Sequence, residues 1–320
     1  MKTRVSVAIR IIVAAFILAG LANAQLKVNP NQAAILRWYA ANQTTAFAVG
    51  TEPRSVAFDG TNIWVANSVN QTVSKLRASD GIVLGTFNAG TYPYHIAFDG
   101  TNIWLSTYGG DAVTKLRASD GTLLDTFTVG NSTSGLAFDG ANIWVVRSGN
   151  NSVTKLRASD GFNLGTFTVG TEPEGVAFDG ANIWVVNQGD NTVTELRASD
   201  GTKLGTFVAG PLRTAPLDIA FDGTNLWVTN YGNGNYVSKL RASDGTLLRS
   251  FGVGSGPLAV AFDGVNIWVT NSNENTVTKL RASDGALLGT FFVGSLPVGL
   301  AFDGANIWVA NSGDNTVSKL

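Results

Sequence analysis

Cysteine is absent from the 320 residues of this chain. Disulfide bonds, thiol catalysis and cysteine metal sites are therefore excluded, and stability has to come from the packing of the fold. Charge is also scarce, because Asp, Glu, Lys and Arg make up 14% of the chain and the formal net charge is -1. This low charge argues against nucleic acid or an anionic membrane surface as a partner.

Long apolar runs are missing too, and the one short run near the amino terminus has the features of an export signal. Three basic residues precede an apolar run over 11–21, and small residues supply a cleavage motif before Gln25. The run is too short to span a bilayer, and no later run approaches the roughly 18 apolar residues that a transmembrane helix needs. We predict a signal peptide over 1–24, no transmembrane segment, and export to the periplasm or the external medium.

What the chain does contain is a repeat. A unit of about forty residues opens with the letters AFDG and runs on to KLRASDG. The phenylalanine of the opening stands at Phe58, Phe98, Phe138, Phe178, Phe221, Phe262 and Phe302. The seven copies are thus spaced by 40, 40, 40, 43, 41 and 40 residues. Such a period is typical of repeat architectures.

Each unit has the pattern of a four-stranded antiparallel meander. In the third copy, apolar runs around 136–138, 143–146, 153–156 and 165–169 are separated by turn residues, with Asp-Gly pairs at two of the turns. Both faces of the second run are apolar, which indicates burial against neighbouring sheets on both sides. A ring of sheets satisfies this requirement. We therefore predict an all-β fold, a seven-bladed β-propeller of four-stranded antiparallel blades.

The two ends of the repeat predict how the ring closes. The seventh unit stops at Leu320, before its fourth strand, while residues 36–50 match residues 76–90 at equal length. We expect 46–49 to supply the missing outer strand, so that an N-terminal strand closes the last blade.

These patterns divide the chain into three parts. A signal peptide over 1–24 is followed by an N-terminal capping segment over 25–44 and by the propeller over 45–320. Residues 29–41 favour a short helix, with continuation of the repeat as strand as the alternative. We expect a monomer.

The chain ends in Ser318, Lys319 and Leu320, the letters of a peroxisomal address. The same triplet occurs in register inside the repeat at 74–76 and 238–240. We attribute the ending to the repeat and not to a targeting signal.

The repeat letters resemble a known family. The second strands read WVTN at 227–230 and 268–271 and WVAN at 64–67 and 308–311, and NTVTKL or NTVSKL follows. With these motifs the chain resembles exported YVTN-type repeat proteins and their NHL-like relatives over roughly residues 45–320. The resemblance implies a β-propeller. It implies no single function, because the group includes surface-layer proteins, binding modules and a few enzymes.

Two enzyme groups share parts of the unit. The DGxxxWV spacing is similar to that of streptogramin lyases, a resemblance that implies a histidine base and a magnesium-binding carboxylate; the chain offers one histidine, His95. The turn whose consensus over the copies is LRASDGTLLGTF is similar to one in pyrroloquinoline-quinone dehydrogenases, but the tryptophan that those enzymes carry after it is replaced by glycine or another residue. We predict no cofactor.

Variation between the copies indicates where a site would lie. In a propeller, the loops before the first strand and between the second and third strands share one face, and these loops vary between the copies, whereas the turns of the opposite face are nearly constant. Loops carry function on a rigid frame, although relaxed constraint would give the same pattern. The candidate ligand-binding residues on this variable face are Arg54, Tyr92, Tyr94, His95, Tyr108, Arg147, Glu174 and Asn187.

The cluster of His95 with three tyrosines allows three interpretations. In an active site, His95 would act as a base while a tyrosine or an arginine stabilised a developing negative charge. In a binding site, the tyrosines would offer flat amphipathic surface to a sugar, a peptide or a small aromatic compound. In a purely structural role, His95 only precedes a strand. Glu172 and Glu174 are candidate ligands for a hard cation, or simply solvated acids.

We therefore predict an exported propeller scaffold that binds a ligand or a protein partner on its variable face without catalysis. A metal-assisted lyase or lactonase that uses the same face is one alternative. A cell-surface structural or adhesive repeat protein is the other.

Overall fold

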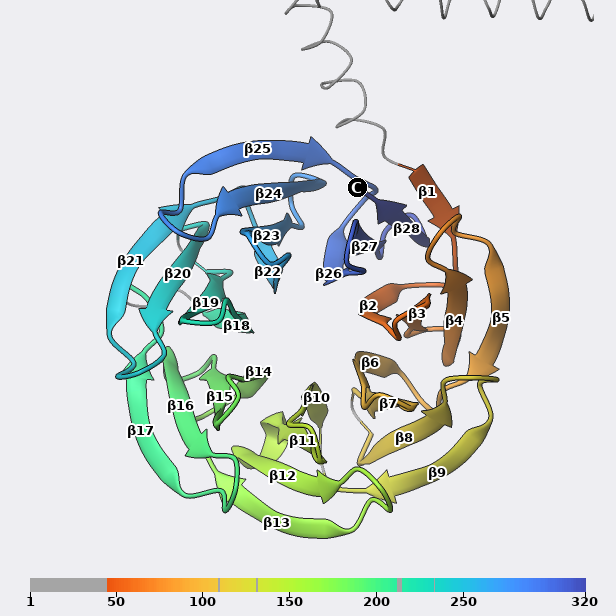
Figure 1. Cartoon of the computed structure of the whole chain (residues 1–320), viewed down its shortest axis with the longest axis horizontal. Coiled ribbons are helices and arrows are strands. Elements are labelled where there is room, and N and C mark those ends of the chain that lie inside the picture. The colour runs from red at the N-terminus through yellow and green to blue at the C-terminus, as the bar shows by residue number, and fades with distance from the viewer. Residues whose placement is uncertain (1–44, 109, 131, 212–214, 233) are drawn as a thin grey trace, which may run out of the picture. The chain divides into compact units, whose positions relative to one another are not determined.

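The computed structural model describes residues 45–108, 110–130, 132–211, 215–232 and 234–320. Seven four-stranded sheets surround a central axis, and each sheet forms one blade (Figure 1). The predicted all-β, seven-bladed propeller is confirmed. The predicted signal peptide, capping segment and short helix lie outside the described residues. Within the described ranges, no helix is long and apolar enough to cross a bilayer.

In each blade the first strand, here called the inner strand, lies nearest the axis and the fourth lies at the circumference (Figure 1). The strands of the first four blades are β2 (Pro53–Phe58), β3 (Asn62–Asn67), β4 (Thr72–Arg77), β5 (Val83–Asn88), β6 (Pro93–Phe98), β7 (Asn102–Thr107), β8 (Ala112–Arg117), β9 (Leu123–Thr128), β10 (Thr133–Phe138), β11 (Asn142–Arg147), β12 (Ser152–Arg157), β13 (Asn163–Thr168), β14 (Pro173–Phe178), β15 (Asn182–Asn187), β16 (Thr192–Arg197) and β17 (Lys203–Val208).

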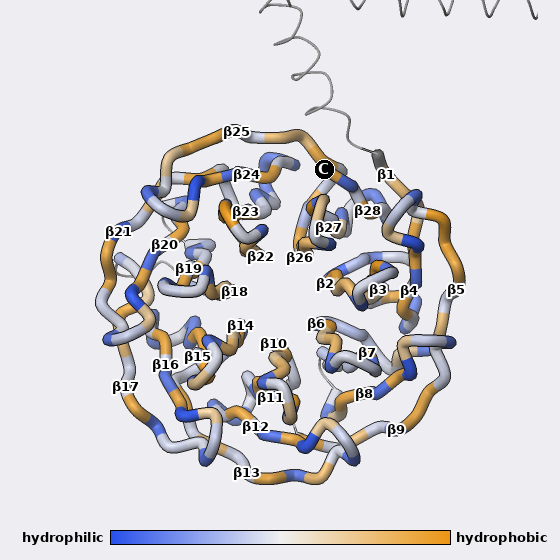
Figure 2. Tube along the Cα trace, viewed as in Figure 1, coloured by the Kyte–Doolittle hydropathy of each residue, from blue (hydrophilic) through white to orange (hydrophobic). Residues whose placement is uncertain are grey.

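The strands of the last three blades, the closing strand and a 3-10 helix are the remaining elements of the described residues. They are β18 (Pro216–Phe221), β19 (Asn225–Asn230), β20 (Tyr236–Arg241), β21 (Leu247–Gly252), β22 (Pro257–Phe262), β23 (Asn266–Asn271), β24 (Thr276–Arg281), β25 (Leu287–Phe292), β26 (Pro297–Phe302), β27 (Ile307–Asn311), β28 (Thr316–Lys319), β1 (Thr45–Ala48) and η1 (Ser148–Asn150). Figure 2 shows hydrophobic residues along the strands and hydrophilic residues in the outer turns.

The Asp-Gly turn between the first and second strands is held by its aspartate. In the third blade, Asp139 Oδ1 accepts the backbone N–H of Ala141 at 2.9 Å and of Asn142 at 2.7 Å, and Oδ2 accepts the indole N–H of Trp144 at 2.8 Å. Gly140 has φ +96°, a conformation that glycine adopts without strain. The same Trp–Asp bond occurs in all seven blades. These aspartates are therefore structural.

The tryptophan of the second strand forms the contact between blades. The ring of Trp144 lies 5.6 Å from the ring of Phe167 in the fourth strand, and Lys155 Nζ lies 5.2 Å from the centre of its ring. Lys155 Nζ also donates to the carbonyl oxygens of Ala198 at 2.7 Å and Ser199 at 3.1 Å in the next blade. Apolar side chains of two consecutive blades surround Trp144. The third blade is thus fastened to the fourth by apolar packing and by a lysine, and the same lysine contact joins four other pairs of consecutive blades.

The last blade is closed by an N-terminal strand, as predicted. Its strand order is β1-β28-β27-β26, and β1 pairs antiparallel with β28 from Thr45↔Lys319 to Ala48↔Thr316. The ring of Phe47 lies 5.5 Å from the ring of Trp308, which is the position that the fourth-strand phenylalanine occupies in other blades. The observed strand begins one residue earlier than the predicted 46–49.

One blade departs from the lysine contact. Glu195 of β16 stands where the other copies carry lysine, and its Oε1 accepts a hydrogen bond from Asn182 Nδ2 at 2.9 Å. Burial and the charge of Asp179 raise the pKa of Glu195, so its ionised form is disfavoured there. The link between the fourth and fifth blades lacks the cation found at Lys155.

We expect Glu195→Lys to stabilise the protein. The new ammonium would reach the carbonyl oxygens of the fifth-blade turn and lie over Trp184, which adds about 1 to 2 kcal/mol to the free energy of unfolding and about 2 to 5 °C to Tm. Thermal unfolding followed by circular dichroism measures this change. The reverse substitution Lys155→Glu is the matched control and should lower Tm. A fall in Tm for Glu195→Lys contradicts the assignment.

Candidate functional site

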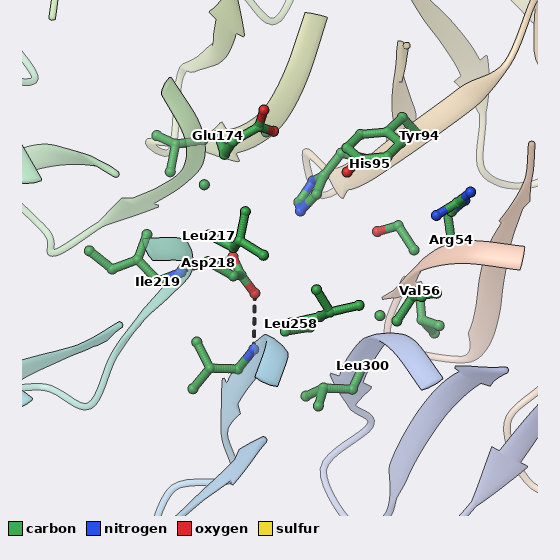
Figure 3. Close-up of a pocket in the computed structure, with 18 residues that line it drawn as sticks. Arg54, Val56, Tyr94, His95, Glu174, Leu217, Asp218, Ile219, Leu258 and Leu300 are labelled. Carbon is green, nitrogen blue, oxygen red and sulfur yellow. Dashed lines mark hydrogen bonds between the residues drawn. The ribbon is translucent and has the colours of Figure 1, made fainter. Parts of the chain in front are cut away.

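The inner strands enclose a cavity on the propeller axis. Its volume is about 310 Å³, and all seven inner strands contribute to its wall (Figure 3). The lining residues are the second to fourth residues of these strands, namely Arg54, Ser55, Val56, Tyr94, His95, Gly135, Glu174, Gly175, Val176, Leu217, Asp218, Ile219, Leu258, Ala259, Val260, Val298, Gly299 and Leu300. A cavity of this size falls at the lower end of the range for small-molecule sites.

Each inner strand begins directly after a loop of the variable face. The second residues of the seven inner strands together form what we call the entrance ring. Its members are Arg54, Tyr94, Ser134, Glu174, Leu217, Leu258 and Val298. The first four blades thus carry polar residues at this position and the last three carry aliphatic ones. Ser134 is buried, donates its hydroxyl to the carbonyl oxygen of Pro173 and is the one member that does not line the cavity. The axial cavity therefore has a polar side and an apolar side.

The third residues of the inner strands set the spacing between blades. A Cβ added at Gly135 would lie 2.4 Å from the carbonyl oxygen of Glu174, and one added at Gly175 would lie 2.6 Å from that of Leu217. Neighbouring inner strands therefore approach so closely at these positions that glycine is required. In the second and fifth blades the same position carries His95 and Asp218 instead.

His95 and Asp218 each bind the backbone of the next inner strand. His95 Nδ1 accepts the N–H of Leu136 at 3.3 Å, while Asp218 Oδ2 accepts the N–H of Val260 at 3.0 Å and Oδ1 accepts that of Ile219 at 2.9 Å. Because Nδ1 accepts a bond, the ring proton of a neutral His95 is assigned to Nε2. These side chains join blades as well as lining the cavity.

Burial shifts the pKa of both groups. Loss of water lowers the pKa of His95 to about 4, so the imidazole is neutral at physiological pH. Burial raises the pKa of Asp218 to about 6, although the N–H groups of Val260 and Ile219 oppose this change. With Nδ1 occupied and a low basicity, His95 is poorly suited to act as a general base at neutral pH.

Glu174 provides a second carboxyl group at the cavity. Its Oε1 accepts a hydrogen bond from Ser148 Oγ at 3.3 Å, a weak contact at the limit of hydrogen-bond length. Burial raises the pKa of Glu174 to about 7, and the negative charge of Glu172 raises it further against the effect of the Ser148 bond. Figure 3 shows His95, Glu174 and Asp218 around the cavity, each from a different strand.

Arg54 and Tyr94 complete the polar side. Arg54 Nη2 lies 3.1 Å from Glu52 Oε2, so the guanidinium already has a carboxylate partner. The Tyr94 ring lies 5.0 Å from that of Tyr108, and burial, with a smaller contribution from Glu174, raises the pKa of Tyr94 to about 12. Tyr94 therefore presents a neutral phenol to the cavity.

The structure brings together half of the predicted ligand-binding residues. Arg54, Tyr94, His95 and Glu174 line the axial cavity. Tyr92 and Tyr108 do not line it, and both side chains are more than half exposed, at 53% and 54%.

Arg147 and Asn187 do not line the cavity. They are the last residues of the second strands β11 and β15. Arg147 Nη2 donates to Asn150 Oδ1 at 3.1 Å. Asn187 is fully buried; its Oδ1 accepts the N–H of Gly170 at 2.9 Å, and its Nδ2 donates to the hydroxyl groups of Thr192 and Thr194. These bonds tie the connection between blades to the third strand.

The two candidate metal ligands have different surroundings. Glu172 has an exposed side chain, and its backbone N–H donates to Asn151 Oδ1 at 3.0 Å, whereas Glu174 lines the cavity. In the part of the chain that the structure describes, no three His, Asp or Glu side chains gather closely enough to hold a metal ion.

The candidate ligand-binding residues do not include Asp218, Leu217 and Leu258, although Asp218 is one of the residues of the variable face that differ between the copies. A signal for Asp218 exists, because the letters HIAF at 95–98 and DIAF at 218–221 place His95 and Asp218 in the same register of the repeat. Leu217 and Leu258 carry no such signal, since aliphatic residues are common in every strand.

The raised pKa of Glu174 predicts how the stability of the folded protein depends on pH. The folded pKa is about 7 and the ordinary value is 4.5, so the contribution of Glu174 to stability is fully present below pH 4.5 and is lost as the pH rises through 7. Glu174→Gln, which cannot ionise, should therefore gain about 2 to 3 kcal/mol relative to the parent between pH 5 and pH 8. Tm measured at both pH values tests this.

The control for this measurement is Glu172→Gln, which removes an exposed carboxylate two residues away. Its Tm difference from the parent should change little between pH 5 and pH 8. A Tm difference for Glu174→Gln that is equal at the two pH values shows that Glu174 is not desolvated.

Comparison with known proteins identifies the fold. No family model matches the chain, and no curated protein sequence matches it. Virginiamycin B lyase from Staphylococcus aureus superposes with a TM-score of 0.75 at 18% identity, covering 87% of this chain and 98% of that one. A streptogramin B lyase structure gives 0.74 at 18% identity, covering 86% and 96%. Hydrazine synthase from Kuenenia stuttgartiensis gives 0.75 at 16% identity, covering 85% and 97%.

These similarities extend over nearly the whole of each neighbour and show a shared seven-bladed β-propeller. The neighbours differ in chemistry, so the scaffold alone does not specify an activity.

Proposed function

We propose that this protein is a non-catalytic binding protein that takes a small amphipathic molecule into the axial cavity from the variable face. The observation that supports the proposal is the division of the entrance-ring residues that line the cavity. The polar members come from the first, second and fourth blades and the aliphatic members from the last three, namely Arg54, Tyr94 and Glu174 against Leu217, Leu258 and Val298. A molecule with one polar end and one apolar end complements such a wall.

The absence of catalysis is supported by the bonding of the titratable groups. His95 Nδ1 and both carboxylate oxygens of Asp218 accept backbone N–H groups of inner strands. These side chains join neighbouring blades, and freeing one for proton transfer would leave a buried N–H without a partner. Their main role in the proposal is to shape the wall of a rigid receptor.

The test uses 2-phenylethanol as a neutral amphipathic probe, followed by saturation-transfer-difference NMR. We expect binding to the full chain and loss of the signal in Leu258→Trp, because the larger side chain fills the apolar side. Leu288→Trp is the matched control, since Leu288 lies on β25 at the circumference and is 43% exposed. Absence of binding to the full chain, or equal binding to both variants, overturns the proposal.

A lyase is the second candidate, favoured by Glu174. A carboxyl group with a pKa of about 7 at the cavity has the basicity of a general base. The fold is also that of virginiamycin B lyase. Incubation of the chain with virginiamycin B and Mg²⁺, followed by chromatography, distinguishes the two functions. Binding without catalysis predicts no consumption. Consumption that disappears in Glu174→Gln would establish the lyase.

We further propose that the binding protein is exported, on the strength of the signal-like pattern over residues 1–24. Amino-terminal sequencing of the mature protein should begin at Gln25. A mature protein that retains residues 1–24 contradicts export by cleavage of this segment.

A further inference from the structure

We propose that the axial cavity selects an organic amine with a short apolar body over neutral and anionic molecules of the same shape. The inference rests on the proposed function and specifies the ligand class of that site. It follows from the charges that face the cavity, from the partners those charges already have, and from the position of the apolar wall.

Negative groups without a cationic partner outnumber positive ones in the cavity wall. Among the lining residues, Arg54 is basic, and its guanidinium is paired with Glu52 at 3.1 Å. Glu174 and Asp218 are acidic and come from the neighbouring strands β14 and β18. His95 is neutral at physiological pH because burial lowers its pKa to about 4. The wall therefore presents two carboxyl groups to a ligand.

Both carboxyl groups lack a basic side chain as partner among the described residues. Asp218 accepts the N–H groups of Ile219 and Val260, and Glu174 accepts the Ser148 hydroxyl at 3.3 Å. Burying a carboxylate without a cation is unfavourable, and accordingly burial raises the pKa of both groups. A ligand ammonium would supply the missing charge and, with it, hydrogen-bond donors.

The aliphatic residues of the cavity wall lie next to the carboxyl groups. Leu217 precedes Asp218 in β18, and Leu258 of β22 lies nearby in the wall (Figure 3). Val298 of β26 continues the aliphatic side. Across the cavity, Tyr94 lies in the electrostatic field of Glu174 and, with a smaller effect, of Asp218, and the charge of Arg54 opposes both. The face of a phenol ring attracts cations. A ligand can thus place its ammonium between acids and tyrosine and its body on the leucines.

The volume of the cavity limits the size of the apolar part of the ligand. The cavity of about 310 Å³ corresponds to the space of roughly ten water molecules. One aromatic ring with a chain of two carbons and an amine fits this space, whereas a peptide of several residues does not.

The experiment compares three probes of one shape, phenethylamine, 2-phenylethanol and 3-phenylpropionate, by isothermal titration calorimetry of the full chain at pH 7.5. We expect phenethylamine to bind at least tenfold more tightly than 2-phenylethanol and 3-phenylpropionate to bind most weakly. Glu174→Gln should reduce the amine affinity at least tenfold and change the alcohol affinity by a smaller factor, so that the preference for the amine is lost. Glu172→Gln, the control, should leave both within twofold.

A second readout separates charge recognition from a change of shape. Binding of the ammonium favours ionised Glu174, so the parent should release protons on binding phenethylamine, seen as a heat that depends on the ionisation enthalpy of the buffer. Glu174→Gln should reduce this release. Equal affinity for the amine and the alcohol overturns the inference while the proposed function stands. Failure of all three probes to bind overturns the proposed function as well.

Discussion

A chain shortened to begin at Val49, and therefore lacking β1, should melt at least 10 °C below a chain that begins at Gln43. The loss removes four backbone pairs with β28 and withdraws Phe47 from Trp308, which is fully buried in the intact blade. Phe47 is partly buried, so its removal costs part of the roughly 3 to 5 kcal/mol of a fully buried phenylalanine. Together with the lost backbone pairs, this is a large fraction of the roughly 5 to 15 kcal/mol that stabilises a typical domain.

The shortened chain should also self-associate. Without β1, strand β28 becomes an unpaired edge beside exposed apolar surface, which is a template for pairing with other chains. Circular dichroism gives Tm and sedimentation velocity gives the association state. A synthetic peptide of residues 43–50, added in trans, should restore part of the lost Tm. A Val49 chain that stays monomeric and melts within 3 °C of the Gln43 chain contradicts the closure assigned to β1.

Trp184→Ala is expected to cost about 3 to 5 kcal/mol, or roughly 6 to 15 °C in Tm. Trp184 is fully buried between the fourth and fifth blades, with its ring 5.7 Å from that of Phe207. Its indole N–H donates to Asp179 Oδ2 at 2.7 Å. Truncation therefore leaves a cavity at a blade interface and also deprives a partly buried carboxylate of a donor.

Trp184→Phe separates these two effects. The phenylalanine keeps most of the apolar volume and loses the N–H, so we expect a smaller cost of about 1 to 2 kcal/mol. Urea unfolding at pH 7 gives both free energies. If Trp184→Ala melts within a degree or two of the parent, the tryptophans are not the core of the blade interfaces.

The fold is predictable from the sequence because each of its determinants recurs. Each unit carries the same residues at the same positions: the Asp-Gly turns, the buried tryptophan and, in all copies but one, the lysine of the third strand. The same reasoning therefore predicts the strands of every blade. The closing strand is also predictable, because the seventh unit lacks the strand that residues before the first unit supply. The limits of single strands differ by a few residues, since hydrogen bonding extends each inner strand beyond its apolar letters, as β10 shows by beginning at Thr133.

Only half of the candidate site is predictable from the sequence. The variation of the loops shows on which face a residue lies but not how far it lies from the propeller axis. Tyr108, Arg147 and Asn187 belong to the same variable face as Tyr94 and Glu174, yet they lie at or just after the ends of second strands, farther from the axis. The cavity is made from the inner strands. The aliphatic residues of the cavity cannot be predicted from the sequence, for a different reason. Aliphatic residues at the cavity look like those of any core strand until the ring is assembled.

The pairing of Thr45 with Lys319 sets the order in which the ring is completed. The two residues are 274 positions apart (319 − 45). At a synthesis rate of about 5 to 20 residues per second, β1 emerges roughly 14 to 55 s before β28 exists. By the end of that interval the first six blades have all their strands, whereas Phe47 has no tryptophan partner until Trp308 is made. The newly made chain therefore carries an unpaired strand, and the synthesis of β28 decides whether it becomes a ring.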